Sequence, residues 1–156
     1  MVTVKVQPPA QVQAGAIMYP PLVVSSDSGD THDFVQVALV DSYGRVLDDQ
    51  LNGTVSTSGK VLHDRSSSRS GGSTAYSVFP DLAVNHAGVY TLRVYVYQMD
   101  YNSTGGAGAI LTASTSTTQI TVYDHSIATE IPSPDEQSLL RRLRRSGGFG
   151  VPRAPR

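Results

Sequence analysis

The 156-residue chain contains no cysteine. Its absence excludes a disulfide framework and a thiolate metal site, and it favours a reducing compartment. No apolar run approaches the roughly 20 residues of a membrane-spanning helix. Residues 1–20 also lack a basic start followed by an apolar core, so we expect neither a secretory leader nor a membrane anchor.

The chain also lacks the spacing patterns of an active site. Its four histidines are scattered among polar loops, and no pair has the spacing of metal ligands. They are His32, His63, His86 and His125. Nothing indicates a nucleophile with a base and an orienting group, and no glycine-rich phosphate loop links a strand to a helix. We therefore predict no enzyme activity, no cofactor and no metal.

Charge is unevenly distributed along the chain. The formal net charge is only -1, yet all 13 acidic residues lie at or before Glu136. Six of the 12 basic residues fall in the last 16 positions. The body therefore carries about -7 and the tail about +6. Such a tail favours an anionic or acidic partner, or the acidic body itself.

Short alternating runs recur between polar connectors, which is typical of an all-β fold. In "VFPDLAVNHAGVYTLRVYVY" (78–97), the side chains of Tyr90, Leu92, Val94 and Val96 share one face of an extended chain. Gly88 just before Tyr90 is typical of the tyrosine corner of an immunoglobulin-like sandwich. The expected strands are 2–6, 22–24, 34–40, 46–55 with an interruption, 76–79, 89–97, 110–113 and 119–123.

The connectors divide the sandwich, which we place at residues 1–132. "VDSYGRV" (40–46) predicts a hairpin turn, with Asp41 and Gly44 supplying the turn chemistry. The stretch 56–74 exceeds the usual loop length of a compact domain, and we expect a long flexible loop there.

One helix is expected, beginning after Ser133. Pro134 follows this cap and Glu136 completes a capping box. Three leucines at 139, 140 and 143 form a narrow apolar stripe, and four arginines crowd the final turns. We assign this helix and the basic tail, 133–156, to the same domain.

Several blocks resemble the velvet domain in the same order. They are "YPPLVV" (19–24), "FVQVALVDSYG" (34–44), "LNGTV" (51–55), "VFPDLAVNHAGVYTLRVYVY" (78–97) and "SPDEQSLLRRLRRSGGFGVPR" (133–153). The velvet family comprises fungal regulators of development, including sporulation, and of secondary metabolism. The resemblance implies an immunoglobulin-like sandwich similar to Rel-homology domains. It also implies a nuclear transcription regulator that forms homo- or heterodimers with velvet proteins, in some complexes with a methyltransferase-like regulator.

One segment departs from the family pattern. DNA-binding velvet proteins have a basic stretch after a Gln-Pro pair, whereas "VQPPAQVQAGAIMYPP" (6–21) contains no Lys or Arg. Phosphate contacts by basic residues supply most nucleic-acid affinity. Direct DNA contact through this segment is therefore not expected.

Two hypotheses remain open from the sequence. In the first, the protein contacts DNA phosphates through basic residues of three segments. These are Lys5, Arg65, Arg69, Arg141, Arg142, Arg144 and Arg145. In the second, it is a partner subunit with little DNA contact of its own. Its protein interface then comprises Tyr95, Tyr97, Leu139, Leu140 and Leu143.

Each hypothesis has a plainer alternative. The leucine stripe is equally compatible with docking on its own domain. The arginines also suit a solvated helix end that complements the helix dipole. An extracellular immunoglobulin-type adhesion module would explain the sandwich and the Asn-x-Thr triplets at Asn52 and Asn102. The missing leader and the velvet-like helix argue against that module.

Overall fold

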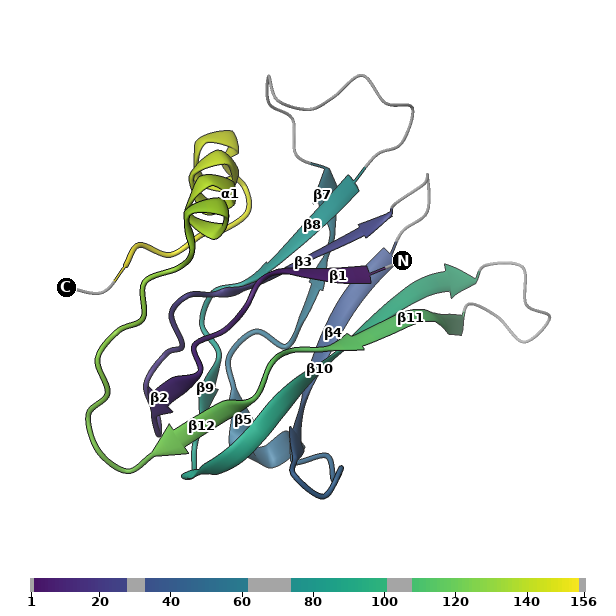
Figure 1. The fold of residues 1–156 in the computed structure, drawn as a ribbon. Helices are drawn as coiled ribbons and strands as arrows, with labels where there is room; N and C mark the ends of the chain where they lie inside the picture. Colours follow the sequence, from purple (N-terminus) through teal and green to yellow (C-terminus); the bar gives the residue numbers. More distant parts are fainter. Residues whose placement is uncertain (1, 28–32, 62–73, 101–107, 155–156) are drawn as a thin grey trace.

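The computed structural model describes residues 2–27, 33–61, 74–100 and 108–154, and it shows two packed β-sheets with one helix against one of them (Figure 1). The four-stranded sheet has the order β1 (Val2–Val6), β3 (Leu22–Asp27), β8 (Thr74–Phe79), β7 (Lys60–Val61). The six-stranded sheet has the order β2 (Gln11–Gln13), β12 (Ile120–Tyr123), β10 (Gly88–Asp100), β4 (Asp33–Asp41), β6 (Ser56–Ser58), and β11 (Gly108–Ser116) also pairs with β10. A small two-stranded sheet joins β5 (Leu51–Asn52) to β9 (Ala83–Val84). The predicted all-β sandwich with a C-terminal helix is confirmed.

The main core lies between the two larger sheets. Alternate residues of β10 point into it, and Leu92 and Val94 are fully buried there. Across the β4–β10 ladder, Leu39 lies opposite Leu92 and Val37 opposite Val94, so both strands contribute the same face. The period of two in the sequence therefore marks the core side correctly.

Some strand boundaries differ from the prediction. In place of the interrupted strand expected over 46–55, the structure has a short 3-10 helix, Asp48–Gln50, followed by the two-residue β5. The loop expected over 56–74 begins with β6 and β7, while 62–73 lie outside the described residues. Strands β2 and β9 were not predicted, because runs of two or three residues carry almost no periodicity. Strand β2 is recognised by its pairing with β12, and strand β9 by its pairing with β5.

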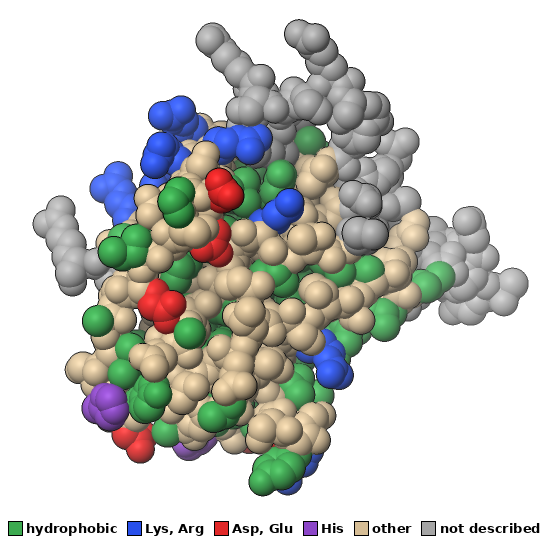
Figure 2. Space-filling model, in the orientation of Figure 1, with side chains coloured by type: hydrophobic (Ala, Val, Ile, Leu, Met, Phe, Trp, Pro, Cys, Tyr) green, Lys and Arg blue, Asp and Glu red, His purple; other side chains and the backbone are tan. Residues whose placement is uncertain are grey.

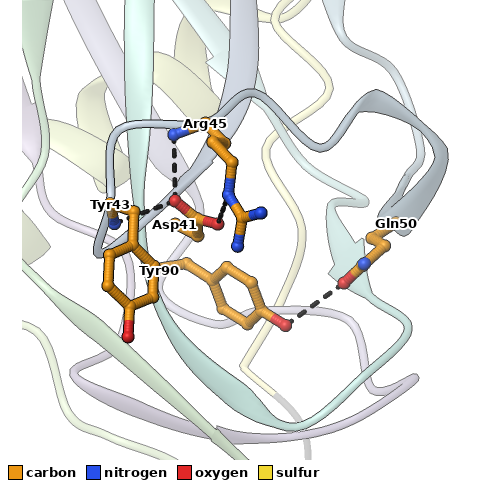
Figure 3. Close-up of polar contacts among 5 residues, drawn as sticks. All are labelled: Asp41, Tyr43, Arg45, Gln50 and Tyr90. Atoms are coloured by element: carbon orange, nitrogen blue, oxygen red, sulfur yellow. Dashed lines mark hydrogen bonds and ion pairs between the residues drawn. The ribbon is translucent and has the colours of Figure 1, made fainter.

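Asp41 holds the hairpin turn that follows β4 (Figure 3). Its Oδ1 accepts the backbone N–H groups of Tyr43 and Arg45, both at 2.9 Å, and its Oδ2 accepts Nε of Arg45 at 3.0 Å. The Arg45 amide, with smaller contributions from the Tyr43 amide and the Arg45 guanidinium, holds the pKa of Asp41 below its ordinary value of 3.8 against the opposing effect of burial. Gly44 takes a positive φ of 83°, and Val40 pairs with Val46 across the turn. The predicted hairpin is confirmed.

Tyr90 forms the predicted tyrosine corner. Its hydroxyl lies 3.1 Å from the carbonyl oxygen of His86 and 3.3 Å from that of Ala87, and 3.2 Å from Oε1 of Gln50 (Figure 3). Burial raises the pKa of the Tyr90 hydroxyl, and the charge of Asp41 adds to the shift. A Cβ atom on Gly88 would lie 2.8 Å from this hydroxyl and 3.0 Å from the ring. Glycine is therefore required before the corner.

Helix α1 (Pro134–Ser146) begins with the predicted capping box. Oγ of Ser133 accepts the amide of Glu136 at 3.2 Å, and Oε1 of Glu136 accepts the amide of Ser133 at 2.9 Å. The other oxygen, Oε2, accepts the amide of Gln7 at 2.8 Å. One carboxylate thus joins the start of the helix to the residue that follows β1. In the described residues, no helix has the length and apolar character that a membrane crossing needs.

The helix covers the outer side of the four-stranded sheet (Figure 1). A second apolar cluster forms there from one residue of each of three strands and the helix leucines. It contains Val6, Val23, Val78, Leu139, Leu140 and Leu143. Phe149 and Val151, beyond the helix, also pack against it. Residues 133–151 are therefore part of the packed sandwich.

Candidate functional site

One candidate surface is the outer side of the six-stranded sheet. Because opposite residues of paired strands share a face, the ladders arrange its side chains in rows. The first row is Ser58, Phe34, Tyr97 and Leu111, on β6, β4, β10 and β11. The second is Ser56, Gln36, Tyr95 and Ser114, and the third is Ala38, Arg93 and Ser116. We call these eleven residues the aromatic face.

Aromatic rings dominate the centre of this face. Phe34 and Tyr97 stack with ring centroids 5.2 Å apart and planes 18° apart. Tyr95 lies next to Tyr97, with centroids 6.2 Å apart. Leu111, opposite Tyr97, is 50% exposed. The rings are only partly buried, so they present a flat apolar area to solvent.

Arg93 is the one charged residue of the aromatic face. It is exposed beside Tyr95 on β10, and in the described part of the chain it has no ion-pair or hydrogen-bond partner. None of the eleven residues is Asp or Glu. The face therefore offers a cation with no internal counterion.

The second candidate surface is the basic end of α1, which we define as Arg141, Arg142, Arg144 and Arg145. Blue side chains gather at this end in Figure 2, whereas red ones lie nearer the start of the helix. Helical geometry places Arg141 and Arg145 one turn apart, directly away from the buried leucines, with Arg142 and Arg144 on either side. The arginines therefore cover the solvent side of the last turns.

Neighbouring segments hold this end in place. Nζ of Lys60 donates to the carbonyl of Gly148 at 2.8 Å, and a terminal nitrogen of Arg144 donates to the carbonyl of Pro152 at 2.9 Å. A groove of about 420 Å³ runs between α1 and residues 129–132, and Arg141 and Arg144 line it with Tyr19. A positively charged side chain near a helix C-terminus is also stabilised by the helix dipole. The basic end thus has a structural role whatever it binds.

The other predicted DNA contacts are less concentrated. Lys5 is exposed on β1, outside the basic end of α1. Arg65 and Arg69 lie outside the described residues. The segment 6–21 is built into the fold. Oε1 of Gln7 accepts the amide of Thr118 at 3.0 Å, and the amide of Gln11 donates to Glu130 at 3.0 Å.

The structure changes the expectation for the leucine stripe. Leu139, Leu140 and Leu143 are 9%, 3% and 0% exposed, and they pack against the protein's own four-stranded sheet. They are therefore not available to a partner while α1 is docked, and the intramolecular alternative describes them. Tyr95 and Tyr97 are brought together on the outer sheet surface, and their role as an interface stays a prediction.

Two histidines lie within the described residues. His86 is exposed in the turn before Tyr90, and the ring of His125 lies 5.1 Å from that of Tyr123. Within residues 2–27, 33–61, 74–100 and 108–154, no group of three or more His, Asp or Glu side chains could hold a metal ion. His32 and His63 lie outside these ranges.

Most residues of the aromatic face, and Lys60 beside the basic end of α1, were not predicted from the sequence. Phe34 and Leu111 join Tyr95 and Tyr97 only through the strand register, whereas Arg93 lies on the same strand as the two tyrosines. Lys60 contacts Gly148, just beyond the end of α1, although the two residues are 88 positions apart in the sequence. Alternation along β10 did place Arg93 on the same side as the tyrosines, so that signal was present. Nothing local indicated Phe34, Leu111 or Lys60.

Comparison with known proteins supports one family. The family model described as Velvet factor matches residues 7–142, which is most of the chain and includes every strand from β2 to β12 and the first turns of α1. A comparison with curated proteins found no match.

Proposed function

The chain belongs to the velvet factor family, and from that premise we propose that it is a nuclear transcription regulator of fungal development and secondary metabolism that acts as one subunit of a dimer. Dimer formation is the better supported part of the proposal. DNA contact is a second part with its own support.

The aromatic face carries the dimer proposal. Exposed aromatic residues and arginine are enriched at protein interfaces, and such residues commonly supply most of the binding energy. Here Phe34, Tyr95 and Tyr97 lie on three adjacent positions of two central strands. A rigid sheet presents them without the entropy cost of ordering a loop. The partner in this proposal is a velvet-domain protein, either a second copy or a different chain.

The basic end of α1 supports DNA contact. Exposed arginines on a packed helix can meet successive phosphates, and each contact releases counterions from the duplex. Acidic residues limit this surface, because Glu130 lines the groove beside Arg141 and Arg144, and Asp135 and Glu136 lie in the first turn of the helix. Phosphate binding is therefore expected only at the C-terminal turns.

A salt series with random-sequence duplex DNA tests this contact. The variant Arg141→Ala, Arg142→Ala, Arg144→Ala, Arg145→Ala should bind more weakly, and its plot of log affinity against log salt should flatten by roughly one unit for each phosphate that the variant no longer neutralises. The control variant Arg45→Ala removes an arginine from the hairpin after β4. An unchanged slope in the helix variant, measured by fluorescence anisotropy, would remove the basic end from the proposal.

A partner subunit without DNA contact is the second candidate function. It is favoured by the segment 6–21, which has no Lys or Arg and whose Gln7 and Gln11 are bonded within the fold. In that case the chain alone shows no salt-dependent DNA binding, while a mixture with a second velvet protein does. The same anisotropy assay, run on the chain alone and on the mixture, distinguishes the two functions.

A further inference from the structure

The aromatic face also indicates what kind of chain it binds. On the basis of the proposed dimer function, we propose that this face binds a different protein chain and not a second copy of this one. The partner presents a carboxylate among apolar side chains.

The two sheets differ in what covers their outer sides. Helix α1 and residues 149–151 cover the outer side of the four-stranded sheet. In the described residues, no helix lies over the outer side of the six-stranded sheet, as Figure 1 shows. Phe34, Tyr95, Tyr97 and Leu111 thus remain accessible on strands fixed by the main core.

Aromatic and leucine side chains supply the apolar part of the contact. The Phe34–Tyr97 stack and the neighbouring Tyr95 form a continuous row of rings on β4 and β10. Leu111 extends it onto β11, where it is 50% exposed. Burying such a cluster gives favourable transfer free energy and adds aromatic contacts. The partner must therefore offer apolar side chains that fit a flat surface.

Arg93 brings a positive charge into the contact. Docking over Tyr95 and Tyr97 removes water from Arg93, which is two residues from Tyr95 on the same face. Burying an arginine without a counterion is costly, so the contact needs an acceptor from the partner. A carboxylate is the best acceptor, because its two oxygens match the guanidinium fork.

A second copy of this chain does not supply that carboxylate. In a two-fold symmetric contact, both sides of the interface are the same patch. The aromatic face has no Asp or Glu, so a symmetric dimer would bury two arginines and no carboxylate. If the partner is a different chain with an acidic residue at the centre of its surface, that residue can pair with Arg93. Charge complementarity thus selects a heterotypic partner.

The test uses a purified velvet-domain chain of different sequence whose matching strands carry an Asp or Glu. Sedimentation velocity at micromolar concentration should show the 16.6 kDa protein alone as a monomer and the mixture as a heterodimer. Arg93→Glu and Tyr97→Ala should each weaken the complex by roughly thirtyfold or more. Lys5→Glu, an equal charge reversal on the helix-covered sheet, should change affinity by less than about twofold.

A charge swap separates pairing from folding damage. Reversing the probe's acidic residue to Arg should restore most of the affinity lost in Arg93→Glu, which a misfolded variant would not allow. Circular dichroism of each variant checks that it remains folded.

Three results would overturn the inference. If no complex forms with the unmodified chain and the chain does not self-associate, the dimer function fails as well. If a complex forms and is unaffected by Arg93→Glu and Tyr97→Ala, the dimer function stands and the aromatic face is not its surface. If the unmodified chain forms a homodimer and the Tyr97→Ala variant is a monomer, a second copy occupies the face.

Discussion

At Asp41, one carboxylate closes a hairpin by accepting three hydrogen bonds from residues two and four positions away. At Tyr90, one hydroxyl ties the start of β10 to the turn that precedes it. These two side chains lie across the β4–β10 ladder, where Tyr90 and Asp41 are paired. Asp41 and Tyr90 thus fix the end of the sheet where β4 finishes and β10 begins.

The lowered pKa of Asp41 predicts a pH effect on stability. A carboxyl whose pKa is lower in the folded than in the unfolded state stabilises the fold at pH values above its unfolded pKa. That contribution is lost as the pH falls through the lower, folded value. Asp41→Asn should therefore be less stable than the unmodified protein at pH 6, and the difference should shrink between about pH 5 and pH 3.

Urea denaturation across that pH range measures this difference. Asp49→Asn is the matched control, because Asp49 lies in the nearby 3-10 helix and its side chain makes no bond in the described structure. A difference between Asp41→Asn and the unmodified protein that stays constant with pH would contradict the assigned role of the Asp41 charge.

Among the elements, α1 serves two purposes on opposite sides. Its leucines complete a second core with Val6, Val23 and Val78, while Arg141, Arg144 and Arg145 are exposed to solvent. Its first turn is joined to the sandwich by Glu136, which caps the helix and also accepts the amide of Gln7. The same element therefore determines both the packing of the four-stranded sheet and the position of the basic surface.

The two bonds of Glu136 predict an order of effects. Ser133→Ala removes one cap bond and should reduce the free energy of unfolding by about 1 kcal/mol. Glu136→Ala also leaves the part-buried amide of Gln7 without its acceptor, so we expect a larger loss, of about 2 kcal/mol. The control Asp135→Ala removes a first-turn charge that makes no cap bond and should cost less than about 1 kcal/mol. Equal effects of Ser133→Ala and Glu136→Ala in chemical denaturation would argue against the bond to Gln7.

For the whole molecule, the important asymmetry is that a helix covers one sheet, whereas in the described part of the chain no helix covers the other. The helix on the covered sheet (Figure 1) carries the basic end, where blue side chains gather in Figure 2, and the other sheet carries the aromatic face. The two candidate surfaces belong to different sheets. A dimer formed through the aromatic face would therefore not cover the basic end of either subunit.

Removing α1 should show that it belongs to the sandwich. A chain that ends at Pro132 exposes the apolar cluster on the outer side of β1, β3 and β8. Each buried leucine contributes about 1.5–3 kcal/mol, and the total stability of a domain is only about 5–15 kcal/mol. The shortened protein should melt well below the full chain and bind a hydrophobic dye. A shortened protein that melts at the temperature of the full chain would contradict this account. The control is the double variant Arg141→Ala, Arg145→Ala, which keeps the helix and should melt near the temperature of the unmodified protein.

Features that depend on neighbouring residues could be predicted from the sequence. Alternation over 89–97 identified the longest strand and its core side, and Ser133, Pro134 and Glu136 marked the start of α1. Asp41 and Gly44 indicated a turn, and Gly88 with Tyr90 indicated the corner. Each of these signals spans fewer than about ten positions, so local geometry and side-chain chemistry suffice to interpret it.

Features that depend on register and packing emerged only in the folded chain. The sequence could not choose between a leucine stripe that docks internally and one that binds a partner, because amphipathicity is the same in both cases. Nor could it join Phe34 and Leu111 to Tyr97, or Lys60 to the end of α1, because these neighbours are set by long-range strand pairing and helix docking. A surface patch is a property of folded neighbours, whereas a strand or a cap is a property of consecutive residues.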